Sequence, residues 1–316
     1  MEYITIIAVI SGISLALLAI GTIGRESVIP AVIATAAGIA LFLYTGGIWV
    51  IAFSELGLAS VAMIHTKKGL IPAIWGIIMT TSLYLLNIQN QSWVPDLLGF
   101  AISSTATMFM VSRIRENDQT NYEMKGKDGR KETLRDVFQI AIGVIMAGAG
   151  FVVGLDFARV GVLAGVLGML VVGNVAYVYP NSAVSRRLWS MERESVFLGL
   201  GAMWIAISSI IAAALSPNLA SFELCILVIF VSDSVATIVG VKYGKTKLYR
   251  GSRKSLQGLV SHGVVSTTAG FLLLGYAGAF IGLVSSMVEG FSQGRLDDNL
   301  TTGTFVSVAV MIARFL

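Results

Sequence analysis

A carboxylate in an apolar segment is the first sign of chemistry in this sequence. Asp233 follows an eight-residue apolar run, Leu224 to Val231, and Lys242 follows nine residues later. An aspartate near the centre of a membrane helix costs roughly 2.5–3.5 kcal/mol and is by default a functional candidate. The helical path from Asp233 to Lys242 is about 13 Å long. We therefore expect Asp233 to lie just beneath a basic membrane surface.

Small residues continue from Asp233 along one face of the predicted helix. Ala236, Gly240 and Gly244 follow it at spacings of three, seven and eleven residues, which places all four on one side. Such a face suits the close packing of another helix. It equally suits a phosphate chain that approaches the backbone, and the four residues alone leave both interpretations open.

A basic loop follows directly. Six basic residues lie between positions 242 and 254, interleaved with Gly244 and Gly251. Ser255 and Gly258 then open the next predicted helix, whose first N–H groups can bind an anion. A membrane anchor is the ordinary role of a basic run, but an anchor needs neither these glycines nor a preceding carboxylate. We predict a nucleotide-phosphate site at Gly240, Lys242, Gly244, Lys245, Lys247, Arg253, Lys254, Ser255 and Gly258, with His262 as a further candidate to face the phosphates.

A second acidic group lies near the carboxyl end of the sequence. Glu289 ends an apolar run, and Asp297, Asp298 and Asn299 open the last one. Mg²⁺ takes few protein carboxylates and keeps several waters, so two or three of these oxygens beside a phosphate chain can hold it. We predict that Asp233, Glu289 and Asp298 form a catalytic Mg²⁺ site, with Asn299 as a further candidate. One of the two aspartates is expected to cap the final helix.

The composition predicts a membrane protein. Of 316 residues, 55% are hydrophobic and 13% are charged, with a mean hydropathy of +0.81. Ordinary soluble domains carry about 25% charged residues, whereas about 20 apolar residues span a bilayer as a helix. The apolar runs are 3–20, 28–44, 47–64, 70–86, 95–112, 137–154, 160–178, 196–215, 219–241, 259–274, 279–288 and 302–316. They predict an all-α, polytopic membrane bundle of roughly 9–11 transmembrane helices with short loops.

The basic residues favour one orientation. When the gaps between runs are assigned to alternate sides, 20 of the 22 Lys and Arg residues share one side, and only Arg159 and Arg314 fall on the other. The positive-inside rule makes the basic side cytoplasmic. We therefore expect a multi-pass protein of a plasma membrane or endomembrane, with its active site on the cytoplasmic face. Basic residues in short gaps suit anionic lipid or phosphate rather than nucleic acid.

One long polar segment divides the sequence. We predict an N-terminal transmembrane block, 1–112, of unassigned role, a cytoplasmic loop, 113–136, and a transmembrane catalytic domain, 137–316. The first apolar run lacks a basic start and a small-residue cleavage site, so we expect a retained helix. Cys225 is the only cysteine, which excludes an internal disulfide.

Part of the sequence resembles the CTP-dependent lipid-alcohol kinases. The similar segments are D-S-V-A-T-I-V-G-V-K-Y-G-K-T-K at 233–247, the following R-K-S-L-Q-G, and the later V-E-G and D-D-N-L-T. This family includes dolichol kinase, phytol kinase and the yeast-type diacylglycerol kinase. The resemblance covers roughly 130–312 and is most specific in its last third. It implies a membrane kinase that transfers the γ-phosphate of CTP to an isoprenoid or other lipid alcohol.

Other parts of the resemblance lie upstream. R-D-V-F-Q-I-A-I-G at 135–143 resembles a family motif that begins R-K-x-x-H, and Arg186–Arg187 with R-E-S at 193–195 resemble its basic-acidic loop. This resemblance makes Arg135, Arg193 and Glu194 further candidate site residues. Asp136 and Gln139 stand where the family has lysine and histidine. The role of the family's histidine is therefore not carried over to this sequence. R-E-S-V-I-P-A-V-I-A-T-A-A-G at 25–38 is similar to prenyl-phosphate kinases, which adds a prenyl monophosphate as an acceptor.

Two other functions share some of these features. CDP-lipid synthases join CTP to a lipid phosphate with release of pyrophosphate at a similar Asp-Gly-Lys site, but their C-terminal lysine-aspartate signature is absent here. A transporter places paired ionisable groups or broken helices at the midplane, whereas most charge here is in loops. The expected partners are membrane lipid, the lipid substrate and a nucleotide. The acceptor, the nucleotide base and homo-oligomer formation stay open.

Overall fold

The computed structural model describes residues 28–46, 50, 53–54, 56–57, 93–116, 129–179, 181–191, 200–252, 254–292 and 297–315. Within these ranges every named element is a helix, and the extended pairing consists of one isolated bridge between Lys247 and Ser255. The all-α part of the prediction is thus confirmed for these residues. The predicted runs 3–20 and 70–86, and most of 47–64, lie outside the described residues.

The chain forms two compact units. The first is Met1–Lys125 with Leu163–Leu200, and the second is Gly126–Val162 with Gly201–Leu316. In the first unit, α2 (Val28–Thr45) packs against α5 (Trp93–Glu116). The short helix α8 (Ala183–Met191) also belongs to it.

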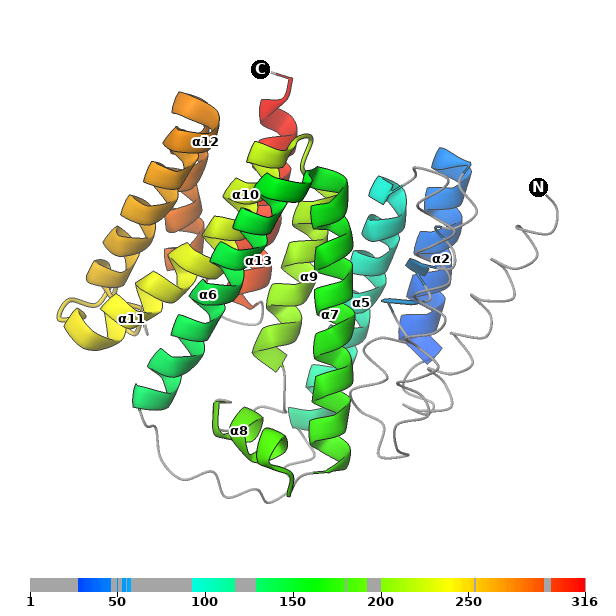
Figure 1. The fold of residues 1–316 in the computed structure, drawn as a ribbon, viewed down its shortest axis with the longest axis horizontal. Coiled ribbons are helices and arrows are strands. Elements are labelled where there is room, and N and C mark those ends of the chain that lie inside the picture. Colours follow the sequence, from blue (N-terminus) through cyan, green and yellow to red (C-terminus); the bar gives the residue numbers. More distant parts are fainter. Residues whose placement is uncertain are drawn as a thin grey trace. The chain divides into compact units, whose positions relative to one another are not determined.

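The second unit contains all the described candidate site residues. Its helices are α6 (Gly129–Val153), the start of α7 (Leu155–Val178), α9 (Leu200–Leu215), α10 (Leu219–Ile226), η2 (Leu227–Ser232), α11 (Asp233–Tyr243), α12 (Leu256–Phe291) and α13 (Asp298–Ala313). The elements α10, η2 and α11 follow one another as a single helical path (Figure 1). The π-helical turn η2 packs against α6, α12 and α13, which places it at the centre of this unit.

Three helices among the described residues are long and apolar enough to cross a membrane. They are Thr133–Val153, Leu219–Tyr243 and Leu256–Phe291. Two shorter apolar helices are Ala31–Thr45 and Gly201–Leu215. The 25 residues of the second helix correspond to about 37 Å of helix, more than the roughly 30 Å of a hydrocarbon core. These lengths and compositions indicate a membrane protein.

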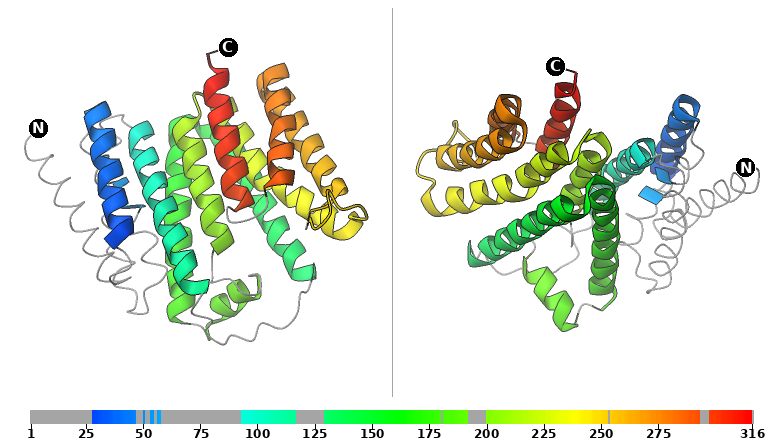
Figure 2. Two further views of the ribbon diagram at one scale, coloured as in Figure 1. Left: turned by 180° about the vertical axis from the view of Figure 1, so that it is seen from behind. Right: turned by 45° about the horizontal axis from the view of Figure 1, so that its top comes forward.

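Helix α12 folds back on itself at Gly275. This residue has φ of 63° and ψ of −144°, and Ser266 Oγ donates a 2.7 Å hydrogen bond to the Gly282 carbonyl. In a straight helix these two residues would lie about 24 Å apart. The predicted runs 259–274 and 279–288 therefore correspond to the two antiparallel arms of one hairpin (Figure 2).

Glycines allow the two arms to touch. A Cβ atom on Gly270 would overlap the Gly278 carbonyl, and one on Gly282 would overlap the Ser266 carbonyl. Small residues on both helices permit such close backbone approach in membrane bundles. The hairpin brings the end of the second arm, near Glu289, back beside the start of the first.

Candidate functional site

Three carboxylates from distant parts of the sequence meet in the second unit. Asp233 begins α11, Glu289 lies in the last turn of α12, and Asp298 begins α13. One carboxylate oxygen from each can be chosen so that all three lie within 4.8 Å of one another. These are the three residues that the sequence predicts as metal ligands, and the structure brings them together.

A π-helical turn positions Asp233. The Asp233 N–H donates to the Val228 carbonyl five residues earlier, which is the π-helical pattern. Such turns are rare and frequently occur at functional sites. Gln139 on α6 donates a 3.3 Å hydrogen bond to the Ile229 carbonyl in this turn. Gly143, one helix turn further along α6, lets that helix approach Phe230, because a Cβ there would overlap the Phe230 side chain.

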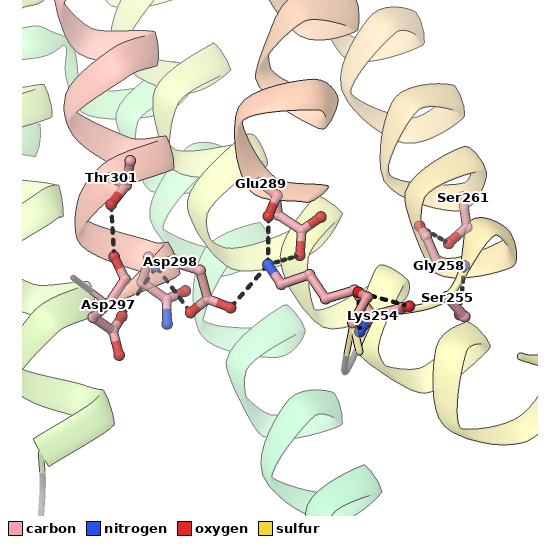
Figure 3. A network of polar contacts seen from close by, with 10 residues as sticks. Lys254, Ser255, Gly258, Ser261, Glu289, Asp297, Asp298 and Thr301 are labelled. Carbon is pink, nitrogen blue, oxygen red and sulfur yellow. Dashed lines mark hydrogen bonds and ion pairs between the residues drawn. The ribbon is translucent and has the colours of Figure 1, made fainter. Parts of the chain in front are cut away.

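Lys254 lies among the carboxylates. Its Nζ is 2.6 Å from Glu289 Oε1 and 3.1 Å from Asp298 Oδ2, and it also donates to the Glu289 backbone carbonyl (Figure 3). Burial alone would lower the pKa of Lys254, but the Asp298 and Glu289 carboxylates outweigh burial and raise this pKa above its ordinary value. The ammonium is therefore charged at neutral pH.

The cluster is open to water on one side. The side chain of Glu289 is 8% exposed, whereas that of Asp298 is 31% exposed, and Asp233 is half-buried. Three carboxylates against one ammonium leave an excess of negative charge with accessible oxygens. Mg²⁺ prefers oxygen ligands and retains waters, so these residues fit it.

The two adjacent aspartates at the start of α13 have different contacts. Asp297 is the N-cap, and its side chain accepts a 3.0 Å hydrogen bond from the Asn299 N–H. Asp298 pairs with Lys254 through Oδ2, and its Oδ1 also accepts from the Asn299 N–H at 3.1 Å. The backbone carbonyl of Asn299 accepts from Ser208 Oγ at 2.9 Å, which ties α13 to α9. As the sequence indicates, one aspartate caps the helix, and the other faces the cluster.

The small-residue face of α11 packs against the start of α12. A Cβ on Gly258 would lie 2.9 Å from the Ala236 carbonyl, and one on Gly240 would lie 3.1 Å from Ser255 Oγ. Ser255 caps α12 by accepting a 3.2 Å hydrogen bond from the Gly258 N–H. Of the two interpretations of this face, close helix packing accounts for Gly240 and Gly258 in the structure.

The basic loop has a defined backbone. Leu248 N–H donates to the Lys254 carbonyl at 3.1 Å, and Leu256 N–H donates to the Thr246 carbonyl at 2.9 Å. Tyr249 stacks on Phe291, with ring centroids 6.2 Å apart, so the loop is held against the second arm of α12. Gly244 and the side chains of Lys242, Lys245 and Lys247 are exposed on this loop, whereas Arg253 lies outside the described residues.

The remaining candidates differ in position. Arg135 on α6 pairs with Asp136 at 3.1 Å. His262 on α12 is fully buried, with Nδ1 3.4 Å from Ser266 Oγ, and its Nε2 has no hydrogen-bond partner within the described part of the chain. Arg193 and Glu194 lie outside the described residues.

Two buried polar residues are not among the predicted site residues. Gln139 occupies a position where the sequence differs from the family motif. Its side chain donates a hydrogen bond to the π-helical turn before Asp233. Glu223 on α10 is 5% exposed and lies among apolar residues. A charged residue in an apolar run is a visible signal, and by that criterion Glu223 could have been singled out from the sequence.

Comparisons with known proteins give no activity for this chain. No protein-family model matches it, and no solved structure matches it. A stretch of 126 residues is 32% identical to the uncharacterized protein MJ1137 of Methanocaldococcus jannaschii. The match covers 39% of this chain and 63% of that protein, so the chain spans less than two thirds of the relative's length.

Proposed function

We propose that this chain is a multi-pass membrane kinase that transfers the γ-phosphate of a nucleotide to a lipid. The observation that carries the proposal is the meeting of Asp233, Glu289 and Asp298 within 4.8 Å, with Lys254 in contact. The resemblance in the stretch 233–258 suggests CTP as the donor. It also suggests an isoprenoid or other lipid alcohol, or a prenyl monophosphate, as the acceptor.

The position of the cluster along the helices supports a site at the membrane surface. Asp233 is ten residues before Tyr243, the last residue of an apolar helix that can span the bilayer. Glu289 is two residues before the end of α12. Both helix ends adjoin the basic loop, which the charge distribution assigns to the cytoplasm. Three candidate spans among the described residues support a multi-pass arrangement of the predicted kind.

Phosphoryl transfer suits this set of residues because it depends mainly on positioning and charge neutralisation. Asp233, Glu289 and Asp298 would hold Mg²⁺, which supplies charge neutralisation on the phosphate oxygens when bound. The exposed lysines of the loop, Lys242, Lys245 and Lys247, attract and orient the nucleotide phosphates. The basic loop thereby binds the donor directly above the carboxylates.

The reaction needs one proton acceptor and one broken bond. The hydroxyl oxygen of the lipid forms a bond to the γ-phosphorus, and the bond from that phosphorus to the β-bridging oxygen breaks. The hydroxyl proton passes to one carboxylate of the cluster, and the nucleoside diphosphate leaves. Asp233 is the favoured acceptor, since its helix can span the membrane, whereas Glu289 and Asp298 each pair with Lys254.

Position-specific labelling tests the proposal. Purified protein is incubated with Mg²⁺, a lipid panel and CTP labelled at either the α- or the γ-phosphorus. We expect label on lipid only from the γ position. Label from the α position would instead identify a cytidylyltransferase, and no transfer to any acceptor would contradict both enzymes and favour a transporter. For any substitution of a cluster carboxylate in this assay, Asp156→Asn is the matched control. Asp156 is a 75% exposed carboxylate that pairs with Arg159 rather than with the cluster.

A further inference from the structure

Lys254 differs from the other cations of its loop in the position of its charge. The side chains of Lys242, Lys245, Lys247 and Arg250 are exposed, whereas that of Lys254 is 19% exposed. Its ammonium contacts the carboxylates of Glu289 and Asp298 at 2.6 and 3.1 Å (Figure 3). Lys254 therefore binds two of the three groups that form the proposed metal site.

The backbone of Lys254 is held independently of its ammonium. Its N–H donates to Ser252 Oγ at 3.0 Å, and its carbonyl accepts from Leu248 N–H at 3.1 Å. The following residue, Ser255, caps α12. A lysine side chain is a flexible four-carbon stem, so the ammonium can leave the carboxylates while the loop keeps its fold.

The ammonium and a divalent cation compete for the same groups. A Mg²⁺ ion lies about 2.1 Å from its carboxylate oxygens. With Nζ at 2.6 Å from Glu289 Oε1, a cation bound to the same oxygen would lie within about 5 Å of the ammonium. At this distance, in a partly buried site, the repulsion is several-fold stronger than it is in water. The oxygen lone pairs of Glu289 and Asp298 that accept hydrogen bonds from Lys254 are also unavailable to the metal.

We infer that the Lys254 ammonium and the divalent cation are alternative occupants of the carboxylate cluster, and that metal binding releases Lys254 to the nucleotide phosphates. This inference rests on the proposed function. Nucleotide phosphates stabilise the displaced ammonium, so metal and nucleotide strengthen each other's binding, and the coupling is reciprocal. Metal alone must displace Lys254 without providing a new partner for it. The site is thus selective for the metal–nucleotide complex over free metal.

Mn²⁺ binding, followed by electron paramagnetic resonance in detergent, tests this competition without any turnover. We expect Lys254→Met to bind free Mn²⁺ about tenfold or more tightly than wild type, because the competing charge is gone. We also expect CTP to tighten Mn²⁺ binding in the wild type and to do so far less in Lys254→Met. Lys245→Met is the control. Because Lys245 is exposed on the same loop, its substitution should not raise the affinity for free Mn²⁺.

A second measurement uses the wild type and so does not depend on the variant folding. Reductive methylation with mass spectrometry should show that saturating Mn²⁺ increases the reactivity of Lys254 several-fold and leaves that of Lys242 unchanged. Unchanged Lys254 reactivity, or free Mn²⁺ affinity in Lys254→Met equal to or below that of wild type, would overturn the inference and leave the kinase proposal standing. Failure of the wild type to bind Mn²⁺ even with CTP would overturn both.

Discussion

Asp297 and Asp298 are neighbours at the start of α13 but have different roles there. The Asp297 side chain accepts from the Asn299 N–H and caps α13, whereas Asp298 reaches Lys254. Caps and metal ligands make different demands on a side chain. A cap needs only an oxygen acceptor, which asparagine also supplies, whereas a metal ligand needs the negative charge.

This difference gives a paired prediction. Asp297→Asn should retain most of the kinase activity and the thermal stability, because asparagine caps helices about as well as aspartate. Asp298→Asn should lower kcat by about 10²–10³, the usual loss for one electrostatic contact to a transition state. Activity at saturating Mg²⁺ and a melting curve in detergent distinguish the two. Equal activities of the two variants would remove Asp298 from the proposed site.

The raised pKa of Lys254 predicts how its ion pairs respond to pH. Asp298 and Glu289 raise this pKa in the folded protein, against the opposing effect of burial. The stabilisation is then fully present below the unfolded-state pKa of lysine, about 10.4, and is lost as pH rises through the higher folded-state pKa. The difference in melting temperature between wild type and Lys254→Met should therefore be constant from pH 7 to about 9 and shrink at higher pH. A difference that grows with alkalinity would contradict the assigned ion pairs.

At the scale of single elements, the α12 hairpin depends on contacts that only glycine permits. Its turn is at Gly275, whose φ of 63° lies in the left-handed region. Between the arms, Gly270 and Gly278 bring the two backbones into contact. Because Glu289 lies on the second arm and Ser255 caps the first, the hairpin determines where the acidic cluster meets the basic loop.

Substitution of a hairpin glycine should therefore destabilise the protein. Gly278→Ala adds a methyl group that overlaps the Gly270 carbonyl, and overpacking typically costs about 1–3 kcal/mol. Gly148→Ala on α6 is the control, because nothing lies within 4 Å of the added Cβ. It should be neutral or stabilise the protein by about 0.5–1 kcal/mol through helix propensity. Unfolding in detergent measures both stabilities. Equal stability of Gly278→Ala and Gly148→Ala would contradict the hairpin packing.

The elements that determine the site were predicted unevenly from the sequence. The runs 219–241, 259–274 and 279–288 predict the helical path through Asp233 and both arms of α12, because apolar length is a strong signal. The π-helical turn before Asp233 leaves no such signal, since its apolar residues fit an α-helix equally well. The small-residue face of α11 was ambiguous in the sequence, and in the structure Gly258 packs closely against Ala236 on this face.

At the scale of the whole molecule, the charge asymmetry predicts where the site faces. The grouping of Asp233, Glu289 and Asp298 was also predicted, because two or three carboxylate oxygens beside a phosphate chain can hold Mg²⁺. The contact of Lys254 with them was not expected, since a basic residue in a loop indicates phosphate binding and its direction depends on the folded loop.

The topology can be tested with the one native cysteine left in place, because Cys225 is fully buried. In intact cells, a membrane-impermeant thiol reagent should not label Arg250→Cys, which lies in the basic loop, nor single cysteines in the 113–135 and 180–195 loops. Asp156→Cys, at a position with a 75% exposed side chain beside Arg159, should be labelled from outside. Labelling of Arg250→Cys from outside would overturn the cytoplasmic assignment.

The most direct measurement for the central claim is turnover and stability of Asp233→Asn. An unpaired aspartate in a membrane helix is unfavourable by a few kcal/mol, so the neutral isostere should leave the protein folded and as stable as wild type. It supplies neither a negative metal ligand nor a base, so γ-phosphate transfer at saturating Mg²⁺ should fall by about 10²–10³. Near-wild-type transfer by Asp233→Asn would contradict the proposed active site, and a loss of stability beside it would show that Asp233 is architectural.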